Sequence, residues 1–304
     1  RSKMPLKISI LGSVVSIILG FSVAYIVGQN SMDFFGFPLL IFCFFYSYIV
    51  HWIFFIHAYI FQTEHYFDAT GSFTYISLSV ILILNSVFNP DFQDLNPYTY
   101  LIGIMVILWS LRLGIFLFKR VKDVGQDVRF IEMKKDFFWF FMTWTLSGLW
   151  VFLTYVAGLS AMTSINLIEN MSLYHFIFMF IGFLLWVLGF IIEILADNQK
   201  KIFRENPINK GKFISSGLWA WSRHPNYFGE IILWLGVSII AFPSMEGGEF
   251  LGLISPIFVY VLLTKISGIP MLEKSSDSKW GTNEDYIKYK KNTPILLPKK
   301  PISN

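Results

Sequence analysis

Eight long apolar runs fill most of the chain, and short polar segments separate them. A helix of about 20 mostly apolar residues is long enough to cross the hydrocarbon core of a bilayer. The third run is short and the eighth carries Lys265 near its end, so the pattern predicts seven or eight membrane-spanning helices. We therefore expect an all-α fold, a polytopic integral membrane helical bundle. The runs are 7–28, 34–61, 73–89, 99–118, 137–160, 172–195, 226–243 and 250–268.

The composition also indicates a membrane protein. The 304 residues are 55% hydrophobic and 14% charged, whereas a soluble domain has about 45–50% apolar and about 25% charged residues. A single cysteine, Cys43, excludes an internal disulfide. Neither an HExxH nor a CxxC motif is present, so we expect no metal site. The opening RSKM resembles an expression remnant before Met4, and Arg1–Lys3 take no part in the fold prediction.

The basic residues fall on one side of the predicted spans. Cytoplasmic loops of membrane proteins carry an excess of Lys and Arg, so we expect both termini to face the cytoplasm. The long polar segments lie on the same side, which is where a soluble cofactor would enter. We expect the membrane to be the inner membrane of a bacterium, or the endoplasmic reticulum if the source is a eukaryote. The predicted loops on the other side of the membrane hold no Lys or Arg. These loops are 29–33, 90–98, 161–171 and 244–249.

Charged side chains occur near the cytoplasmic ends of two spans, where they often mark function. Arg112 lies one to two turns inside the fourth span and faces either a ligand or, by snorkelling, the headgroups. Glu193, Asp197 and Lys201 recur at i, i+4 and i+8 and share one helix face, with Arg204 on a neighbouring stripe. We expect this helix to continue to ENPINKG. It is either part of a site or a solvated, salt-bridged helix end.

The segment FQTEHYFDATGS begins at Phe61, and its residues 62–72 form a predicted loop. The loop contains acidic, amide and phenol side chains but no Lys or Arg. This composition is unfavourable beside an anionic leaflet. The segment therefore either lines a ligand or protein surface or contains an Asx-type turn in which Asp68 starts the third span. Its candidate functional side chains are Gln62, Glu64, Tyr66 and Asp68.

A second polar cluster, SRHPNYFGEIILWLG, opens the seventh span at residues 222–236. Pro225 suits the first turn of a helix, so we expect the helix to start there. Its free N–H groups and positive dipole end make an anion site. Glu230 lies well inside the apolar run, where an unpaired carboxylate costs several kcal/mol. The alternative is an N-cap cluster with one satisfied glutamate. The candidate ligand contacts are Arg223, His224, Asn226, Tyr227 and Glu230.

Together these features suit a nucleotide-like cofactor, with its phosphates at the membrane surface and its reactive end in the bilayer. We expect Arg223 and His224 to contact the phosphates, and Asn226, Tyr227 and Glu230 to reach toward the reactive end. Neither GxGxxG nor GxxxxGK[ST] occurs in the chain, so a Rossmann or P-loop site is excluded. We therefore expect a pocket built between the spans.

The stretch GLWAWSRHPNYFGEIILWLG resembles the C-terminal signature of the steroid 5-alpha-reductase family. WSLRLGIFLFKR, GQDVRF and GIPMLEKSSDSKWGTNEDYIKYKKNTPILLP resemble its bacterial branch, and the likeness extends from about Phe67 onward. The resemblance implies NADPH-dependent reduction of the C4–C5 double bond of 3-oxo-4-ene steroids or a similar lipid enone, by hydride transfer with enolate stabilisation. The superfamily also includes sterol C14 reductases and isoprenylcysteine carboxyl methyltransferases.

The resemblance also implies roles for particular residues. Arg112, Glu193, Asp197 and Arg204 match cofactor-binding positions, although the family usually has Asn where this chain has Glu193. We assign Lys201, which lies on the same helix face, to the cofactor as well.

The substrate groups match the family less closely. Gln62 and Trp109 are the expected substrate contacts, and Trp109 stands about where the family has a tyrosine. Glu64, Tyr66 and Asp68 are the candidate proton donors for the enolate oxygen, because a carboxyl in a dry pocket can stay protonated.

Two other functions stay open at this point. A SAM-dependent methyltransferase of a lipid or prenyl thiol or carboxyl would carry a similar Arg-His-Pro element. A non-enzymatic lipid-binding or scaffold protein is the other alternative. The expected partners are a lipid or steroid substrate and membrane lipids, with no nucleic acid and no metal. We expect residues 1–72 to form N-terminal helices with a substrate-side loop and residues 73–304 to form the catalytic domain.

Overall fold

The computed structural model describes residues 4–88, 96–124, 130–165 and 171–301. Eight helical segments of these residues are long and apolar enough to cross a membrane, which confirms the predicted all-α membrane bundle. Arg1–Lys3 and parts of the predicted loops 90–98 and 161–171 lie outside the described residues. The α-helices are α1 (Leu6–Val27), α2 (Leu39–Ile60), α3 (Phe67–Phe88), α4 (Pro97–Val124), α5 (Phe137–Thr163), α6 (Leu173–Glu205), α7 (Pro225–Ala241), α8 (Ile254–Val261), α9 (Ile269–Trp280) and α10 (Glu284–Asn292). Shorter 3₁₀ segments are η1 (Gly28–Asn30), η2 (Met133–Lys135), η3 (Pro207–Asn209), η4 (Gly217–Ala220), η5 (Phe242–Ser244) and η6 (Gly247–Leu253), and η7 (Leu262–Ile266) is a π-helical stretch.

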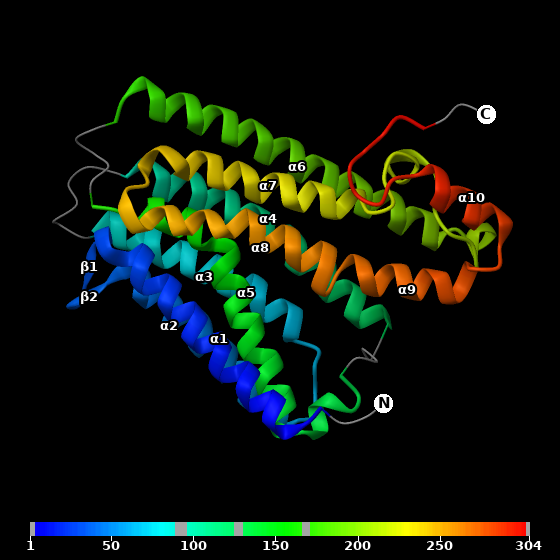
Figure 1. Ribbon diagram of the computed structural model, residues 1–304, viewed down its shortest axis with the longest axis horizontal. Coiled ribbons are helices and arrows are strands. Elements are labelled where there is room, and N and C mark those ends of the chain that lie inside the picture. Colours follow the sequence, from blue (N-terminus) through cyan, green and yellow to red (C-terminus); the bar gives the residue numbers. More distant parts are fainter. Residues whose placement is uncertain (1–3, 89–95, 125–129, 166–170, 302–304) are drawn as a thin grey trace. The chain divides into compact units, whose positions relative to one another are not determined.

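The chain divides into two compact units, and the first contains residues 1–178 and 241–255. Helix α5 lies at the centre of this unit, where it packs against α1, α2, α3 and α4 (Figure 1). Most of its residues are buried. Small residues allow transmembrane helices to approach closely. On α2, the Ser47 hydroxyl donates to the Gly148 carbonyl oxygen of α5 at 2.8 Å.

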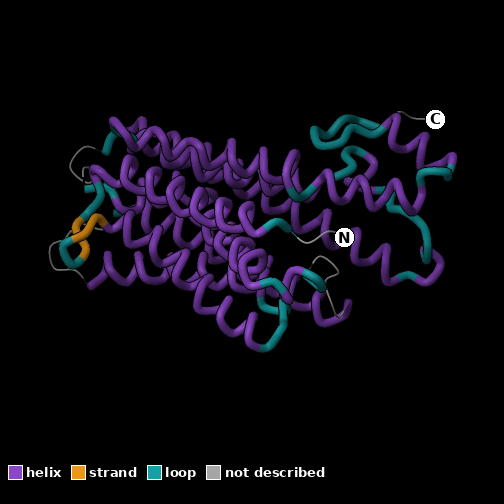
Figure 2. The backbone as a smooth tube through the Cα atoms, turned by 60° about the horizontal axis from the view of Figure 1, so that its bottom comes forward, coloured by secondary structure: helices purple, strands orange, loops and turns teal. Residues whose placement is uncertain are grey.

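A short β-hairpin connects α1 to α2 in the first unit (Figure 2). Its strands are β1 (Asp33–Phe34) and β2 (Phe37–Pro38), paired antiparallel. The two turn residues, Phe35 and Gly36, have φ values of 51° and 84°. Two successive residues at positive φ are typical of a tight type I′ turn, which reverses the chain and keeps α1 and α2 adjacent.

The second unit contains residues 179–240 and 256–304 and is built on the pair α6 and α7. Glycines Gly182 and Gly189 on α6 face Gly236 and Gly229 on α7, so the two helices are antiparallel. A Cβ at Gly229 would lie 2.5 Å from the Gly189 carbonyl oxygen, and one at Gly236 would lie 2.5 Å from that of Gly182. The backbones of the two helices are therefore in direct contact along this glycine seam.

Several predicted boundaries differ from the structure. Helix α3 begins at Phe67 and not at 73, so the predicted loop 62–72 ends at Tyr66. Helix α4 continues beyond 118 to Val124. Helix α6 continues to Glu205, as expected, and α7 begins at Pro225, as expected. The two compact units do not coincide with the predicted domains 1–72 and 73–304. That functional division stays a prediction. The cytoplasmic orientation of the termini also stays a prediction.

Candidate cofactor site

The candidate site in the second unit begins where the end of α6 meets the start of α7. The Asn226 amide donates to the Asp197 carboxylate at 3.1 Å. Glu193, Asp197 and Glu230 are all buried. A Cβ at Gly229 would lie 2.8 Å from the Glu193 backbone nitrogen, so this turn of α6 lies directly against the start of α7. The structure thus brings Glu193, Asp197 and Asn226 together, and Glu230 follows one turn after Asn226 on α7.

The segment between α6 and α7 folds back onto the end of α6. The indole N–H of Trp219 donates to the Ala196 carbonyl at 3.0 Å, and the Leu218 N–H donates to the Gln199 side-chain oxygen at 2.9 Å. The Tyr289 hydroxyl of α10 donates to the Trp219 carbonyl at 2.6 Å. These bonds fix the residues that precede α7 between α6 and the C-terminal helices.

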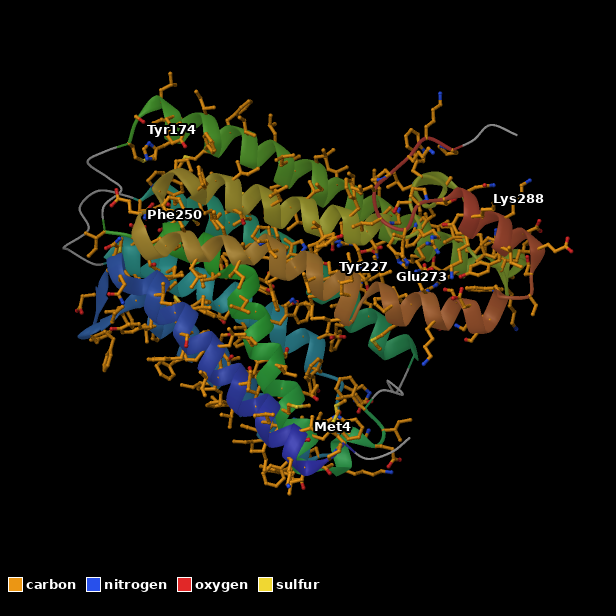
Figure 3. The ribbon with its side chains drawn as sticks, in the orientation of Figure 1. Met4, Tyr174, Tyr227, Phe250, Glu273 and Lys288 are labelled. Atoms are coloured by element: carbon orange, nitrogen blue, oxygen red, sulfur yellow. The ribbon has the colours of Figure 1, made fainter. Side chains whose placement is uncertain are left out.

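Glu273 of α9, labelled in Figure 3, connects two residues of the sequence motif at the start of α7. One carboxylate oxygen accepts from His224 Nε2 at 2.7 Å, and the other pairs with the Arg223 guanidinium. Lys290 Nζ lies 3.4 Å from Glu273 and 2.6 Å from Asp277. Arg223 and His224 therefore have a protein partner, and their predicted contact with phosphates stays a prediction.

Burial lowers the pKa of the His224 imidazole, although its bond to Glu273 acts in the opposite direction. A neutral imidazole has one N–H, and Glu273 can only accept, so we place that hydrogen on Nε2. Nδ1 is then an acceptor, and it has no hydrogen-bond partner among the described residues. Arg223 Nε and Asn226 Oδ1 also have no hydrogen-bond partner among the described residues. Buried polar atoms are usually paired, so these three atoms indicate a ligand.

A cavity of about 150 Å³ opens beside this cluster, within the second unit. Aromatic rings contribute to its lining, and Lys200 Nζ lies 4.5 Å from the centroid of one of them, Trp219. Glu273 is the one acid among the described lining residues. Lys and Arg bind phosphate oxygens through charge-assisted hydrogen bonds, so this cavity suits an anionic group. Its basic residues are Lys200, Arg204, Lys212, Arg223 and Lys279.

The remaining predicted residues of the second unit differ in their placement. Tyr227 stacks against His224, with the ring centroids 6.0 Å apart and the planes at 14°. Lys201 is exposed and lies 3.7 Å from Glu205. Its neighbour Lys200, which we did not assign to the site, lines the cavity instead.

Sequence reasoning missed the contribution of the C-terminal segment. Glu273, Lys279 and Tyr289 come from α9 and α10, and Lys212 comes from the segment before α7. The signal was the stretch GIPMLEKSSDSKWGTNEDYIKYKKNTPILLP, which we used for the resemblance only.

Four of the predicted substrate-side residues lie in the first unit, in the segment between α2 and α3 and in the first turn of α3. Glu64 is buried and accepts from Lys134 Nζ at 2.8 Å. The Gln62 amide donates to the Lys134 carbonyl at 2.8 Å and also to the Tyr59 carbonyl. Tyr66 is 45% exposed, and Asp68 lies in the first turn of α3. Gln62 and Glu64 thus converge on Lys134, and the chemical roles predicted for all four residues stay predictions.

Trp109 and Arg112 both lie on α4 of the first unit. Trp109 is fully buried and packs edge to face against Tyr75, with centroids 5.3 Å apart. The Arg112 guanidinium lies 5.5 Å from the ring centroid of Phe116, one turn further along α4. Contacts of Trp109 with a substrate and of Arg112 with a cofactor stay predictions.

Comparison with known proteins places this site within a family. Residues 54–293 match the family described as "Protein of unknown function (DUF1295)". The chain belongs to this family. It is also homologous to steroid 5-alpha-reductases and a sterol C14 reductase, which confirms the predicted superfamily. No solved structure matches the chain.

Three curated relatives show how far the similarity extends. A "Probable O-methyltransferase ustE" of Ustilaginoidea virens is 36% identical over 58 residues, 19% of this chain and 20% of the relative. "3-oxo-5-alpha-steroid 4-dehydrogenase 1" of Rattus norvegicus is 26% identical over 117 residues, 38% of this chain and 40% of the relative. "Delta(14)-sterol reductase" of Arabidopsis thaliana is 31% identical over 90 residues, 26% of this chain and 23% of the relative. The chain thus spans about a fifth to two fifths of the length of these relatives.

Proposed function

We propose that this protein is an NADPH-dependent membrane oxidoreductase that reduces the C4–C5 double bond of a 3-oxo-4-ene steroid or a similar lipid enone. The observation that carries the proposal is the basic, aromatic cavity lined by Arg223, His224 and Glu273. The reductases among the relatives support the choice of reaction class.

The residues of the second unit fit one end of a phosphorylated dinucleotide. Small-molecule sites are usually about 300–1,000 Å³, so a cavity of about 150 Å³ fits only part of a cofactor, such as a phosphate with its sugar. Arg223 Nε and His224 Nδ1 belong to residues that line the cavity and have no partner among the described residues, so they offer a donor and an acceptor to such a group. In this proposal Asp197, Arg204 and Glu230 also belong to the cofactor site.

When bound, NADPH would supply the hydride for the reduction. The protein must then stabilise the negative charge that develops on the carbonyl oxygen of the enone. Tyr66 and Asp68 are our candidates for the group that donates a hydrogen bond or a proton to that oxygen. Glu64 is a third candidate, although Lys134 already occupies one of its carboxylate oxygens. Gln62 and Trp109 would contact the rest of the substrate.

The test is reduction by the purified protein in detergent or nanodiscs. The protein is incubated with NADPH and a panel of 4-ene-3-one steroids and other lipid enones, and the absorbance at the nicotinamide band is followed. We expect enone-dependent oxidation of NADPH, with loss of activity in Asn226→Ala. Absence of oxidation with every enone of a broad panel, together with absence of NADP⁺ binding, contradicts the proposal.

The second candidate function is SAM-dependent methylation of a lipid or prenyl thiol or carboxyl. The similarity to a probable O-methyltransferase, 36% over 58 residues, favours it. Competition binding separates the two functions, because a reductase binds NADP⁺ without displacement by SAM and a methyltransferase shows the reverse.

A further inference from the structure

The charges around Glu273 are balanced. Arg223 and Lys290 each carry a positive charge, and Glu273 and Asp277 each carry a negative charge. Burial keeps the pKa of His224 low, so its imidazole adds no charge at neutral pH. The pair that begins the motif, Arg223 with His224, is therefore much less attractive to an anion than two cations would be.

The contacts of Glu273 also fix which atoms of this pair are presented to a ligand. Its oxygens occupy Nε2 of His224 and one terminal nitrogen of Arg223. What is left includes Nδ1 of His224, an acceptor, and Nε–H of Arg223, one of the remaining donors of the guanidinium. Both atoms are buried without a partner among the described residues, and both side chains line the same cavity.

The basic character of the cavity comes from other residues. Lys212 and Lys279 line it, and neither forms an ion pair with an acid among the described residues. Lys200 and Arg204 on α6 add two further positive charges. A phosphate is better matched by these groups than by an arginine whose charge a buried carboxylate already compensates.

We propose that Glu273 is a positioning residue that compensates the charge of Arg223 and holds Arg223 and His224 as a donor–acceptor pair, which binds an uncharged hydroxyl or amide group of the cofactor. In this arrangement Lys200, Arg204, Lys212 and Lys279 bind the phosphate. The inference rests on the proposed function, and it assigns the Arg-His pair to a different part of the ligand from the one that the sequence suggested.

The first experiment compares the salt dependence of NADP⁺ binding, measured by titration at about 20 mM and about 500 mM salt. Salt screens interactions between charges. We expect Lys279→Gln to weaken binding about tenfold at low salt and much less at high salt, and Arg223→Gln to weaken it by a similar factor at both. Lys291→Gln, an exposed lysine of α10 outside the cavity, is the control. A loss in Arg223→Gln that disappears at high salt overturns the proposal.

The second experiment tests the acceptor at Nδ1. Asparagine places an oxygen at about the same distance from the backbone as Nδ1 of histidine, whereas leucine has similar bulk and no acceptor. We expect His224→Asn to bind NADP⁺ within about threefold of the original protein and His224→Leu to lose about tenfold, the usual order for one hydrogen bond. Equal losses in the two variants contradict the acceptor role.

The third experiment needs no ligand. Long-range ¹H–¹⁵N spectra of histidine-labelled protein report which ring nitrogen carries the hydrogen, and His224→Asn identifies the signal. We expect the neutral form protonated on Nε2 at pH 7, with this preference lost in Glu273→Leu and unchanged in the exposed-residue control Glu284→Gln. A charged ring, or a hydrogen on Nδ1, overturns the positioning role. If the spectra agree but the protein binds no NADP⁺, the proposed cofactor fails and the positioning of His224 stands.

Discussion

The glycine seam between α6 and α7 gives the sharpest test of the structure, through the substitution Gly229→Ala. The added Cβ would lie 2.5 Å from the Gly189 carbonyl oxygen and 2.8 Å from the Glu193 nitrogen. Both atoms belong to the backbone of α6, so no side-chain rotation can relieve the contact. The helices must separate instead.

The size of the effect follows from these distances. Ordinary contact of a Cβ begins at 3.4 Å, so α6 and α7 must move apart by about 0.9 Å near Gly229. Overpacking of this kind costs about 1–3 kcal/mol. A displacement of that size along the Asn226–Asp197 bond would lengthen it from 3.1 Å to about 4.0 Å, which is outside the range of a hydrogen bond. The substitution should therefore weaken both stability and cofactor binding.

The assay is thermal unfolding in detergent together with NADP⁺ titration. Alanine is a better helix former than glycine by about 0.8–1 kcal/mol, so the control must share that gain. Gly71→Ala on α3 is such a control, because it is also a helical Gly-to-Ala change but causes no clash. The added Cβ would lie 3.8 Å from Val151, an ordinary contact. We expect Gly229→Ala to be about 1–3 kcal/mol less stable than Gly71→Ala. Gly236→Ala should lose similar stability but keep more affinity, since it lies two turns further from Asn226. Equal unfolding temperatures for Gly229→Ala and Gly71→Ala would refute the backbone contact.

Three further substitutions test other parts of the structure. Lys134→Met leaves Glu64 buried without its ammonium partner at 2.8 Å, and we expect a loss of about 3 kcal/mol in denaturant unfolding; a loss under about 0.5 kcal/mol contradicts the buried pair. Burial lowers the pKa of His224 from its ordinary 6.5, so the unfolded state binds more protons and stability should fall as the pH decreases below about 6.5. His224→Asn should flatten that dependence, and an unchanged slope would contradict it. Asp136 caps α5 by accepting from the Trp139 N–H at 3.0 Å, so Asp136→Ala should cost about 1 kcal/mol while Asp136→Ser stays close to the original protein in the same unfolding assay.

The membrane spans could be predicted from sequence because lipid leaves the backbone few alternatives to a helix. The predicted start of α3, at residue 73, was wrong for a physical reason. Thr70 and its polar neighbours suggested a loop, but the Thr70 hydroxyl donates to the Tyr66 carbonyl at 2.6 Å inside the helix. A hydroxyl that bonds one turn back satisfies itself locally, so hydropathy alone places such a boundary too late.

The candidate site was predictable only in its local part. The spacing from Glu193 to Asp197 and the proline at the start of α7 sufficed to predict the two helix segments that meet at Asn226. The partner of His224 is 49 residues further along the chain, at Glu273. No periodicity connects residues at that separation. If the contact with Glu273 is not known, Arg223 and His224 look like two cations, and phosphate is the ligand that one would assign to them.

The two parts of this site are held by different means, and the difference has consequences. Asp197 and Asn226 lie on helices whose backbones touch, so the spacing of the two backbones is set by glycines. Arg223 and His224 are held through one carboxylate on α9, and Glu273→Gln would loosen them without displacing α6 from α7. Rigid support is what precise positioning of a reacting group requires. We therefore expect the reactive end of the cofactor to lie near the glycine seam and its phosphate end near α9.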